Sequence, residues 1–75
     1  MEEKLKAIMA EVFNVSESEI SEKSSLHSIS SWDSLTHINL IMVLQKKFNI
    51  RFEDEEIPTM VNYMMISNTI KSYID

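Results

Sequence analysis

The chain has 75 residues, with 7 Lys and Arg against 12 Asp and Glu, and these counts predict one acidic domain with a net charge of −5 and a small core. The acidic balance argues against a nucleic-acid-binding protein, which is usually basic. The absence of Cys and Gly excludes disulfides, cysteine zinc sites, thiol nucleophiles and the glycine-dependent phosphate-binding loops.

No targeting or membrane segment is predicted. Glu2 and Glu3 stand where a signal peptide would be basic. The longest nearly apolar run covers residues 40–44, whereas a membrane span needs about 20 residues. We therefore expect a cytoplasmic protein that binds neither membrane nor nucleic acid.

Residues 2–14 are predicted to form an amphipathic helix. Apolar residues recur there at helical spacing, at Leu5, Ile8, Met9, Val12 and Phe13. The acidic residues of the first turn complement the helix dipole.

Residues 15–33 are rich in serine, which accounts for eight of the nineteen positions. Such a composition is typical of flexible linkers. Five large apolar residues nevertheless interrupt the stretch, at Val15, Ile20, Leu26, Ile29 and Trp32. We therefore predict a long ordered loop held to the core by these side chains, and long ordered loops are often functional.

A second helix is predicted from Asp33 or Ser34 to Lys47 or Phe48. Asp33 is a suitable N-cap, and Trp32 before it is placed to contact His37. One stripe of this helix comprises Leu35, Ile38, Ile41, Met42, Gln45 and Phe48, widened by Leu40, Val43, Leu44 and Lys47. From Leu40 to Leu44 the helix is apolar nearly all round, so it is either central to the bundle or exposes part of this surface to a partner.

The remaining residues predict a short helical turn and a last helix. The turn spans 54–57 and ends before Pro58. The helix spans about 61–74, capped by Thr59 or Asn62, with its apolar stripe at Tyr63, Ile66, Ile70, Tyr73 and Ile74. The predicted fold is all-α: a small antiparallel four-helix bundle with three main helices, one short helical turn and a long loop between the first two helices.

Metal binding and hydrolysis are both disfavoured. His27 and His37 lack partners at ligand spacing, and the acidic run 54–56 is expected to be a solvated surface. Asp33, Ser34 and His37 are the residue types of a catalytic triad, but they lie within one helical turn, whereas triads draw on separate elements around a cleft.

Ser34 is the most informative position. It stands at the first turn of a helix, where unpaired backbone N–H groups and the helix dipole favour a phosphate. The alternative is that Ser34 merely adds to the helix cap.

The segment 33–52, DSLTHINLIMVLQKKFNIRF, resembles the signature of the acyl carrier protein family. Asp33, Ser34 and Leu35 match its Asp-Ser-Leu motif, and the family's aliphatic positions are matched by Ile38, Leu40, Ile41, Met42, Leu44 and Phe48. The resemblance in length, acidity, long first loop and helix order extends over the whole chain.

The resemblance implies that Ser34, flanked by Asp33 and Leu35, carries 4′-phosphopantetheine derived from coenzyme A. The arm's thiol would hold an acyl or aminoacyl group as a thioester, so the chain would be a carrier and not an enzyme. The implied partners are a phosphopantetheinyl transferase, an acyl-loading ligase or acyltransferase, and the downstream enzymes of fatty-acid, polyketide or other specialised pathways. A monomer is expected.

The second helix departs from the family pattern. Thr36 replaces a usually acidic residue, the usual Glu-rich stretch reads Asn39, Gln45, Lys46 and Lys47, and no acid occurs between Asp33 and Glu53. Because charge at the rim of an interface steers association, this change favours a specialised carrier over the housekeeping carrier of fatty-acid synthesis. Recognition by partners is then predicted to rest on Ile41 and Met42, with Thr36 and His37.

The resemblance also implies a place for cargo between the second and last helices, with Leu40, Leu44, Ile57, Met60 and Met64 as lining residues. The alternative is that the methionines simply fill the core. The alternative function is an unmodified helical adaptor that binds a partner through the apolar face of residues 40–44.

Overall fold

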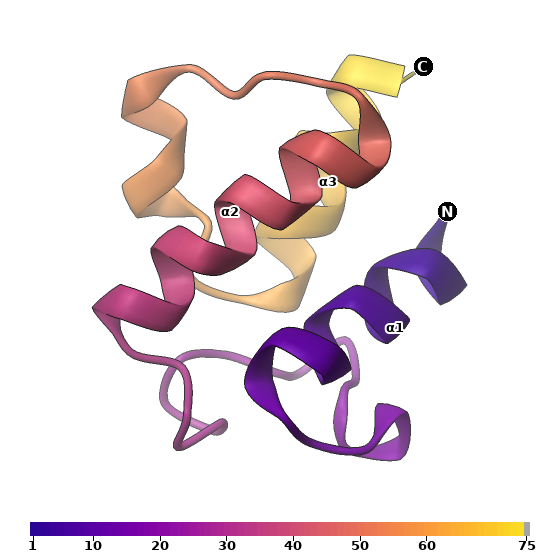
Figure 1. The fold of residues 1–75 in the computed structure, drawn as a ribbon, viewed down its shortest axis with the longest axis vertical. Coiled ribbons are helices and arrows are strands. Elements are labelled where there is room, and N and C mark those ends of the chain that lie inside the picture. The colour runs from indigo at the N-terminus through magenta and orange to yellow at the C-terminus, as the bar shows by residue number, and fades with distance from the viewer. Residues whose placement is uncertain (75) are drawn as a thin grey trace.

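The computed structural model describes residues 1–74 and confirms the all-α fold (Figure 1). Its α-helices are α1 (Glu2–Phe13), α2 (Ser34–Phe48) and α3 (Tyr63–Ile74). Two 3₁₀ helices, η1 (Glu17–Glu19) and η2 (Asp54–Thr59), lie in the connections. None of the helices within 1–74 combines the length and hydropathy needed to cross a bilayer.

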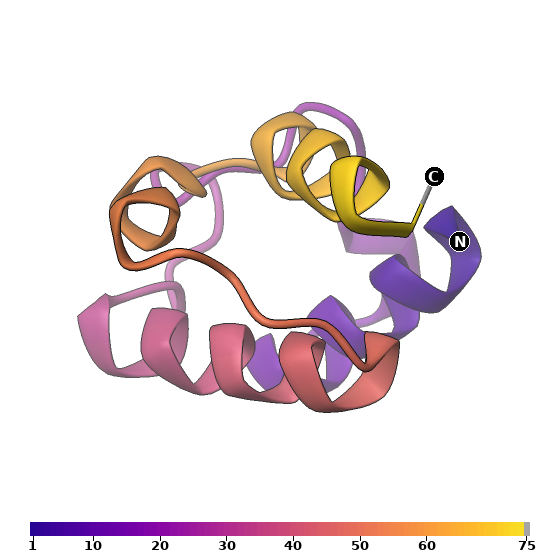
Figure 2. The same cartoon turned by 90° about the horizontal axis from the view of Figure 1, so that it is seen from above.

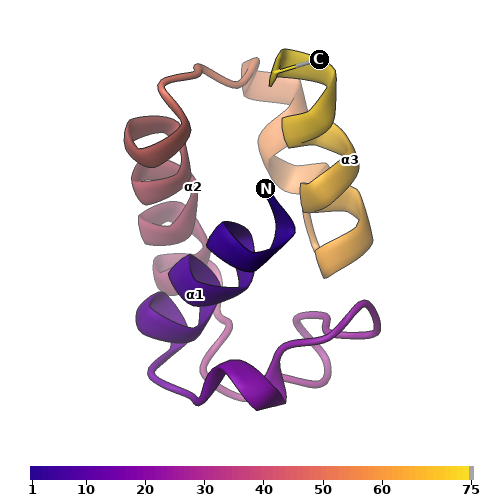
Figure 3. The same ribbon diagram turned by 90° about the vertical axis from the view of Figure 1, so that its right-hand side faces the viewer.

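The helices are not all antiparallel. α1 runs against α2, whereas α2 and α3 run in the same general direction (Figures 1 and 3). The reason is η2, which leads the chain back along the bundle before α3 begins. Seen from above, α2 forms one side of the molecule, and α3 with η2 forms the other (Figure 2).

Two asparagines end the first two helices. Asn14 and Asn49 adopt left-handed backbone angles, with φ of 58° and 55°. In both places the next residue donates its N–H back into the helix, Val15 to the Ala10 carbonyl and Ile50 to the Gln45 carbonyl, each at 3.0 Å. Asparagine tolerates this conformation better than most residues. The chain therefore terminates its helices without glycine.

The core is formed by all three α-helices and the long loop. Buried apolar residues are Leu5, Ile8, Met9, Ala10, Phe13, Ile20, Ile29, Trp32, Leu40, Ile41, Leu44, Phe52, Met60, Tyr63, Ile66 and Ile70. The predicted stripe of α1 is confirmed except at Val12, which is only half-buried. In α3 the stripe is confirmed as far as Ile70, beyond which Tyr73 and Ile74 are exposed.

The apolar residues of α2 divide between a buried and an exposed face. Leu35, Ile38 and Met42 are exposed by 80%, 51% and 63%, whereas Leu40, Ile41 and Leu44 are buried. α2 is apolar nearly all round, so its periodicity did not distinguish the side that packs from the side that faces solvent. The packed side continues towards the N-terminus through the half-buried His37.

The serine-rich loop is ordered, as predicted. Its serines bond to backbone groups: Ser24 is buried, and the Ser31 hydroxyl donates to the Phe13 carbonyl at 2.8 Å. Ile20, Ile29 and Trp32 enter the core, and Val15 is half-buried. The prediction was wrong for Leu26, which remains 37% exposed and lies beside a surface cavity described below.

The turn at η2 extends past Pro58 to Thr59, further than predicted. The fixed φ of proline is compatible with a 3₁₀ helix, and a 3₁₀ helix does not require the bond to the fourth residue back that proline prevents in an α-helix. Of the two predicted caps of α3, the structure selects Asn62, whose side-chain oxygen accepts the Met65 N–H at 2.8 Å.

Candidate functional site

Ser34 is the first residue of α2, and its side chain is exposed. The helix is capped by its neighbour: an Asp33 carboxylate oxygen accepts the Thr36 N–H at 2.8 Å. Because Asp33 performs the capping, the Ser34 hydroxyl is not required for it. The predicted N-cap is therefore confirmed, and Ser34 presents its hydroxyl at the positive end of the helix dipole.

Thr36 completes the cap. Its hydroxyl lies beside the Asp33 carboxylate and 2.6 Å from the Ser31 carbonyl, and it accepts the Asp33 N–H at 3.3 Å. Hydrogen bonds from Thr36 hold the pKa of the Asp33 carboxyl below its ordinary value. The Thr36 hydroxyl, predicted for partner docking, is thus already bonded within the chain, which leaves its methyl group for any partner.

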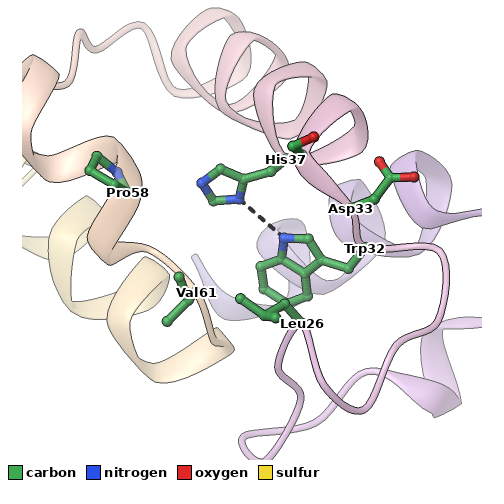
Figure 4. A pocket seen from close by; sticks show the side chains of 7 residues that line it. Leu26, Trp32, Asp33, His37, Pro58 and Val61 are labelled. Carbon is green, nitrogen blue, oxygen red and sulfur yellow. Dashed lines mark hydrogen bonds between the residues drawn. The ribbon is translucent and has the colours of Figure 1, made fainter.

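Trp32 and His37 form a hydrogen-bonded bridge beside Ser34 (Figure 4). The Trp32 indole N–H donates to His37 Nδ1 at 3.1 Å, and His37 Nε2 lies 2.9 Å from the Ile57 carbonyl. An indole N–H can only donate, so His37 Nδ1 accepts, and its proton is on Nε2, donated to Ile57. The bridge therefore joins the long loop, α2 and η2 through one neutral histidine tautomer. The sequence-predicted contact between Trp32 and His37 is confirmed.

The hydrogen bonds of His37 also bear on the hydrolase alternative. Both ring nitrogens are engaged, one with Trp32 and the other with Ile57. A general base for Ser34 would need a ring nitrogen directed at the serine hydroxyl. Within residues 1–74, no group of three His, Cys, Asp or Glu side chains is placed to hold a metal ion. The geometry supports neither nucleophilic catalysis nor a metal centre at this site.

A cavity of about 260 Å³ opens beside Ser34. Its walls are mostly apolar and come from the loop, α2, η2 and the segment that follows η2 (Figure 4). They comprise Leu26, Trp32, Asp33, Ser34, His37, Pro58 and Val61. Backbone pairing across the cavity fixes two of these residues, because Leu26 donates its N–H to the Val61 carbonyl at 3.1 Å and Tyr63 donates to the Ser24 carbonyl at 2.8 Å.

The outer side of α2 carries an apolar surface, which we call the α2 surface and define as Leu35, Ile38 and Met42. A hollow of about 440 Å³ lies along it, lined also by Asp33, Thr36 and Asn39. No Asp, Glu, Lys or Arg occurs from Ser34 to Gln45. Met42 was predicted at this surface. Ile41, predicted with it, is only 3% exposed and packs in the core, because it lies about a quarter of a turn round the helix from this surface, next to Leu44.

Sequence reasoning did not identify Leu35 and Ile38 as part of an exposed apolar surface. Their spacing with Met42 is that of one helix face, which periodicity alone detected without indicating its orientation. The buried face of α2 is marked by Leu40 and Leu44, which pack with Ile41 in the core.

The predicted cargo residues do not line the cavity beside Ser34. Leu40, Leu44 and Met60 are fully buried, and Ile57 is half-buried. Met64 is 49% exposed on α3, so its predicted place in the interior was wrong. Of the methionines, only Met9 and Met60 fill the core; Met1, Met42, Met64 and Met65 are exposed.

The fold and the site together define a class of protein. A small helical domain presents a serine at the start of a helix, between a capping aspartate and an exposed apolar surface. Residues 3–70 match the family described as the phosphopantetheine attachment site.

Individual relatives agree with this match. The chain is 34% identical over 74 residues to an acyl carrier protein of Buchnera aphidicola subsp. Baizongia pistaciae, which covers 99% of this chain and 95% of the relative. It is also similar to the acyl carrier proteins of Wolinella succinogenes, with 38% identity over 69% of this chain and 68% of the relative, and of Helicobacter pylori, with 35% identity over 80% and 77%. The chain therefore belongs to the acyl carrier protein family.

The general function of the chain follows from its membership of this family. The chain is a carrier and not a catalyst, its prosthetic group is phosphopantetheine, and it works with transferases and biosynthetic enzymes. The group supplies the thiol that holds the cargo, which agrees with a chain that contains no cysteine of its own.

Proposed function

We propose that Ser34 is the residue that receives the phosphopantetheine arm, and that the chain thereby carries acyl or aminoacyl groups as thioesters. The observation that supports this assignment most strongly is the position of Ser34. Its exposed hydroxyl begins α2, and the neighbouring Asp33 already satisfies the cap.

The surroundings of Ser34 suit a phosphodiester. The first backbone N–H groups of α2 and the helix dipole stabilise negative charge at this end of the helix. In the attachment step, a bond forms between Ser34 Oγ and the phosphorus of coenzyme A next to the pantetheine. The phosphorus–oxygen bond of its diphosphate breaks, adenosine bisphosphate leaves, and the serine proton passes to a base of the transferase.

The proposal is tested by the intact mass of the folded chain after incubation with coenzyme A and a broad-specificity phosphopantetheinyl transferase. We expect a gain of one phosphopantetheine, located by peptide mass analysis on the peptide that contains Ser34. Addition to another of the many serines in residues 15–33 would contradict the assignment.

The composition of α2 supports a specialised carrier rather than the housekeeping carrier of fatty-acid synthesis. The helix has no acidic residue from Ser34 to Phe48 and ends in Lys46 and Lys47. Steering towards basic partner surfaces is therefore weak at this helix. The proposal also includes a monomeric, cytoplasmic carrier whose arm is attached by a phosphopantetheinyl transferase and loaded by an acyl ligase or acyltransferase.

We assign partner docking to the α2 surface. Every enzyme that acts at Ser34 must approach the start of α2, and Leu35, Ile38 and Met42 are the large apolar side chains exposed along that helix. Apolar contacts of this kind dominate interface energies, whereas nearby rim charges contribute less. The favoured partner surface is apolar and fits the hollow beside Met42.

Replacement of Met42 by serine is expected to lower kcat/KM for arm attachment about tenfold, the effect of losing about 1.4 kcal/mol of interface contact. Met64→Ser is the matched control, because Met64 is also exposed but lies on α3. It should leave the rate unchanged. The assay is the initial rate of mass gain at subsaturating carrier concentration. Equal rates for the two variants would contradict docking at Met42.

A further inference from the structure

We infer that the cavity lined by Leu26, Trp32, Pro58 and Val61 holds the part of the arm nearest the phosphate, namely its branched, dimethyl-substituted pantoyl group. This inference rests on the proposed attachment at Ser34. It assigns a binding role to four residues outside the Asp-Ser-Leu motif.

Position is the first argument. Ser34 is itself part of the cavity wall, so a group bonded to its hydroxyl starts at the rim. Only the section of the arm within a few bonds of the phosphate is close enough to Ser34 to lie wholly inside the cavity. Pockets that enclose whole drug-sized ligands measure about 300–1,000 Å³. A cavity of about 260 Å³ therefore suits a section of the arm and not the complete arm with its cargo.

The chemistry of the walls is the second argument. Leu26, Trp32, Pro58 and Val61 present carbon surfaces from three segments of the chain (Figure 4). The nitrogens of His37 are both engaged, with Trp32 and Ile57, so its ring adds no free hydrogen-bonding group to the wall. The quaternary carbon with two methyl groups next to the phosphate is the apolar section that lies within this reach.

The frame around the cavity is the third argument. Trp32 is buried and is fixed by Phe13 at a ring-centroid distance of 4.7 Å and by His37. Leu26 and Val61 are held together by the backbone bond between their segments. Since these walls are in place before loading, the arm loses less freedom on docking than it would on a mobile loop.

The Trp32–His37–Ile57 bridge separates this cavity from the core. Leu40, Leu44 and Met60 lie wholly buried, and none of them contributes to the cavity wall. The proposed contacts of the pantoyl section are therefore made at this surface cavity and not with these core residues.

Trp32 is the only tryptophan of the chain, which makes the inference directly measurable. After loading with coenzyme A and transferase, confirmed by mass, we expect a change in Trp32 fluorescence and a shift of its indole N–H resonance. Nuclear Overhauser contacts should join the two arm methyl groups to the methyl groups of Val61 and Leu26.

A double variant, Leu26→Ser with Val61→Ser, removes apolar wall without touching Trp32 or Ser34. It should still gain the mass of the arm but lose these contacts, and the arm resonances should move to those of free pantetheine. Met64→Ser, an apolar-to-polar change on α3 outside both the cavity and the α2 surface, should keep the contacts.

The outcomes separate the two proposals. A loaded native chain whose arm methyl groups show no contact with Leu26, Trp32 or Val61 overturns the inference and leaves attachment at Ser34 intact. A chain that gains no mass at Ser34 overturns the attachment proposal, and the inference falls with it.

Discussion

Trp32→Ala is expected to lower the unfolding free energy by about 3–5 kcal/mol, the usual cost of removing a large buried aromatic side chain. Trp32 is 4% exposed, packs on Phe13 and donates its indole N–H to His37. A domain of 75 residues has a total of only about 4–11 kcal/mol. The variant should therefore lose a large fraction of its stability, which urea titration followed by circular dichroism measures as a much lower midpoint.

Trp32→Phe separates packing from hydrogen bonding. Phenylalanine keeps an aromatic ring against Phe13 but cannot donate to His37, so we expect a smaller loss of about 1–3 kcal/mol. The phenylalanine variant should remain folded at neutral pH. If Trp32→Ala were within 1 kcal/mol of the native chain, the loop could not be anchored to the core through this residue, and the account of the ordered loop would be wrong.

The helices of this protein could be predicted because their apolar residues repeat at 3.6-residue spacing. In α1, one stripe is apolar and the rest is polar, so periodicity defined both the helix and its buried face. In α2, apolar residues surround the helix, and periodicity did not separate the exposed Leu35, Ile38 and Met42 from the buried Leu40, Ile41 and Leu44. Only tertiary packing, in which α1 contacts α2 and Leu40, Ile41 and Leu44 join the common core, determines which side is buried.

The candidate site likewise has one part that the sequence predicts and another part that it does not. Asp33 was identified as the cap because capping is a local property of the chain and is visible in neighbouring residues. Ser34 was identified through the resemblance of residues 33–35 to the Asp-Ser-Leu motif. The cavity could not be predicted, because Leu26, Pro58 and Val61 are brought to Ser34 by long-range backbone bonds between residues 24–26 and 61–63. The partner of His37 at Ile57 is twenty residues away and is a carbonyl oxygen, which no side-chain pattern reveals.

Ser34→Ala is expected to abolish arm attachment, while the fold is retained. The hydroxyl oxygen is the atom that would form the bond to phosphorus, so alanine removes the reaction itself and not merely part of its rate. Stability should change by less than about 0.5 kcal/mol, as for other exposed positions, because Asp33 and Thr36 make the cap. Intact mass after prolonged incubation measures attachment, and urea titration measures stability.

Ser30→Ala is the matched control for this experiment, since Ser30 is an exposed serine of the long loop four residues before Ser34. It should acquire the arm at the native rate. A Ser34→Ala chain that still gained the full mass would place the arm on another serine, and the phosphate would then lie away from the N–H groups that begin α2. Because Ser34→Ala and Ser30→Ala remove the same hydroxyl group from exposed positions, a difference in attachment between them measures the position of the serine and not its chemistry.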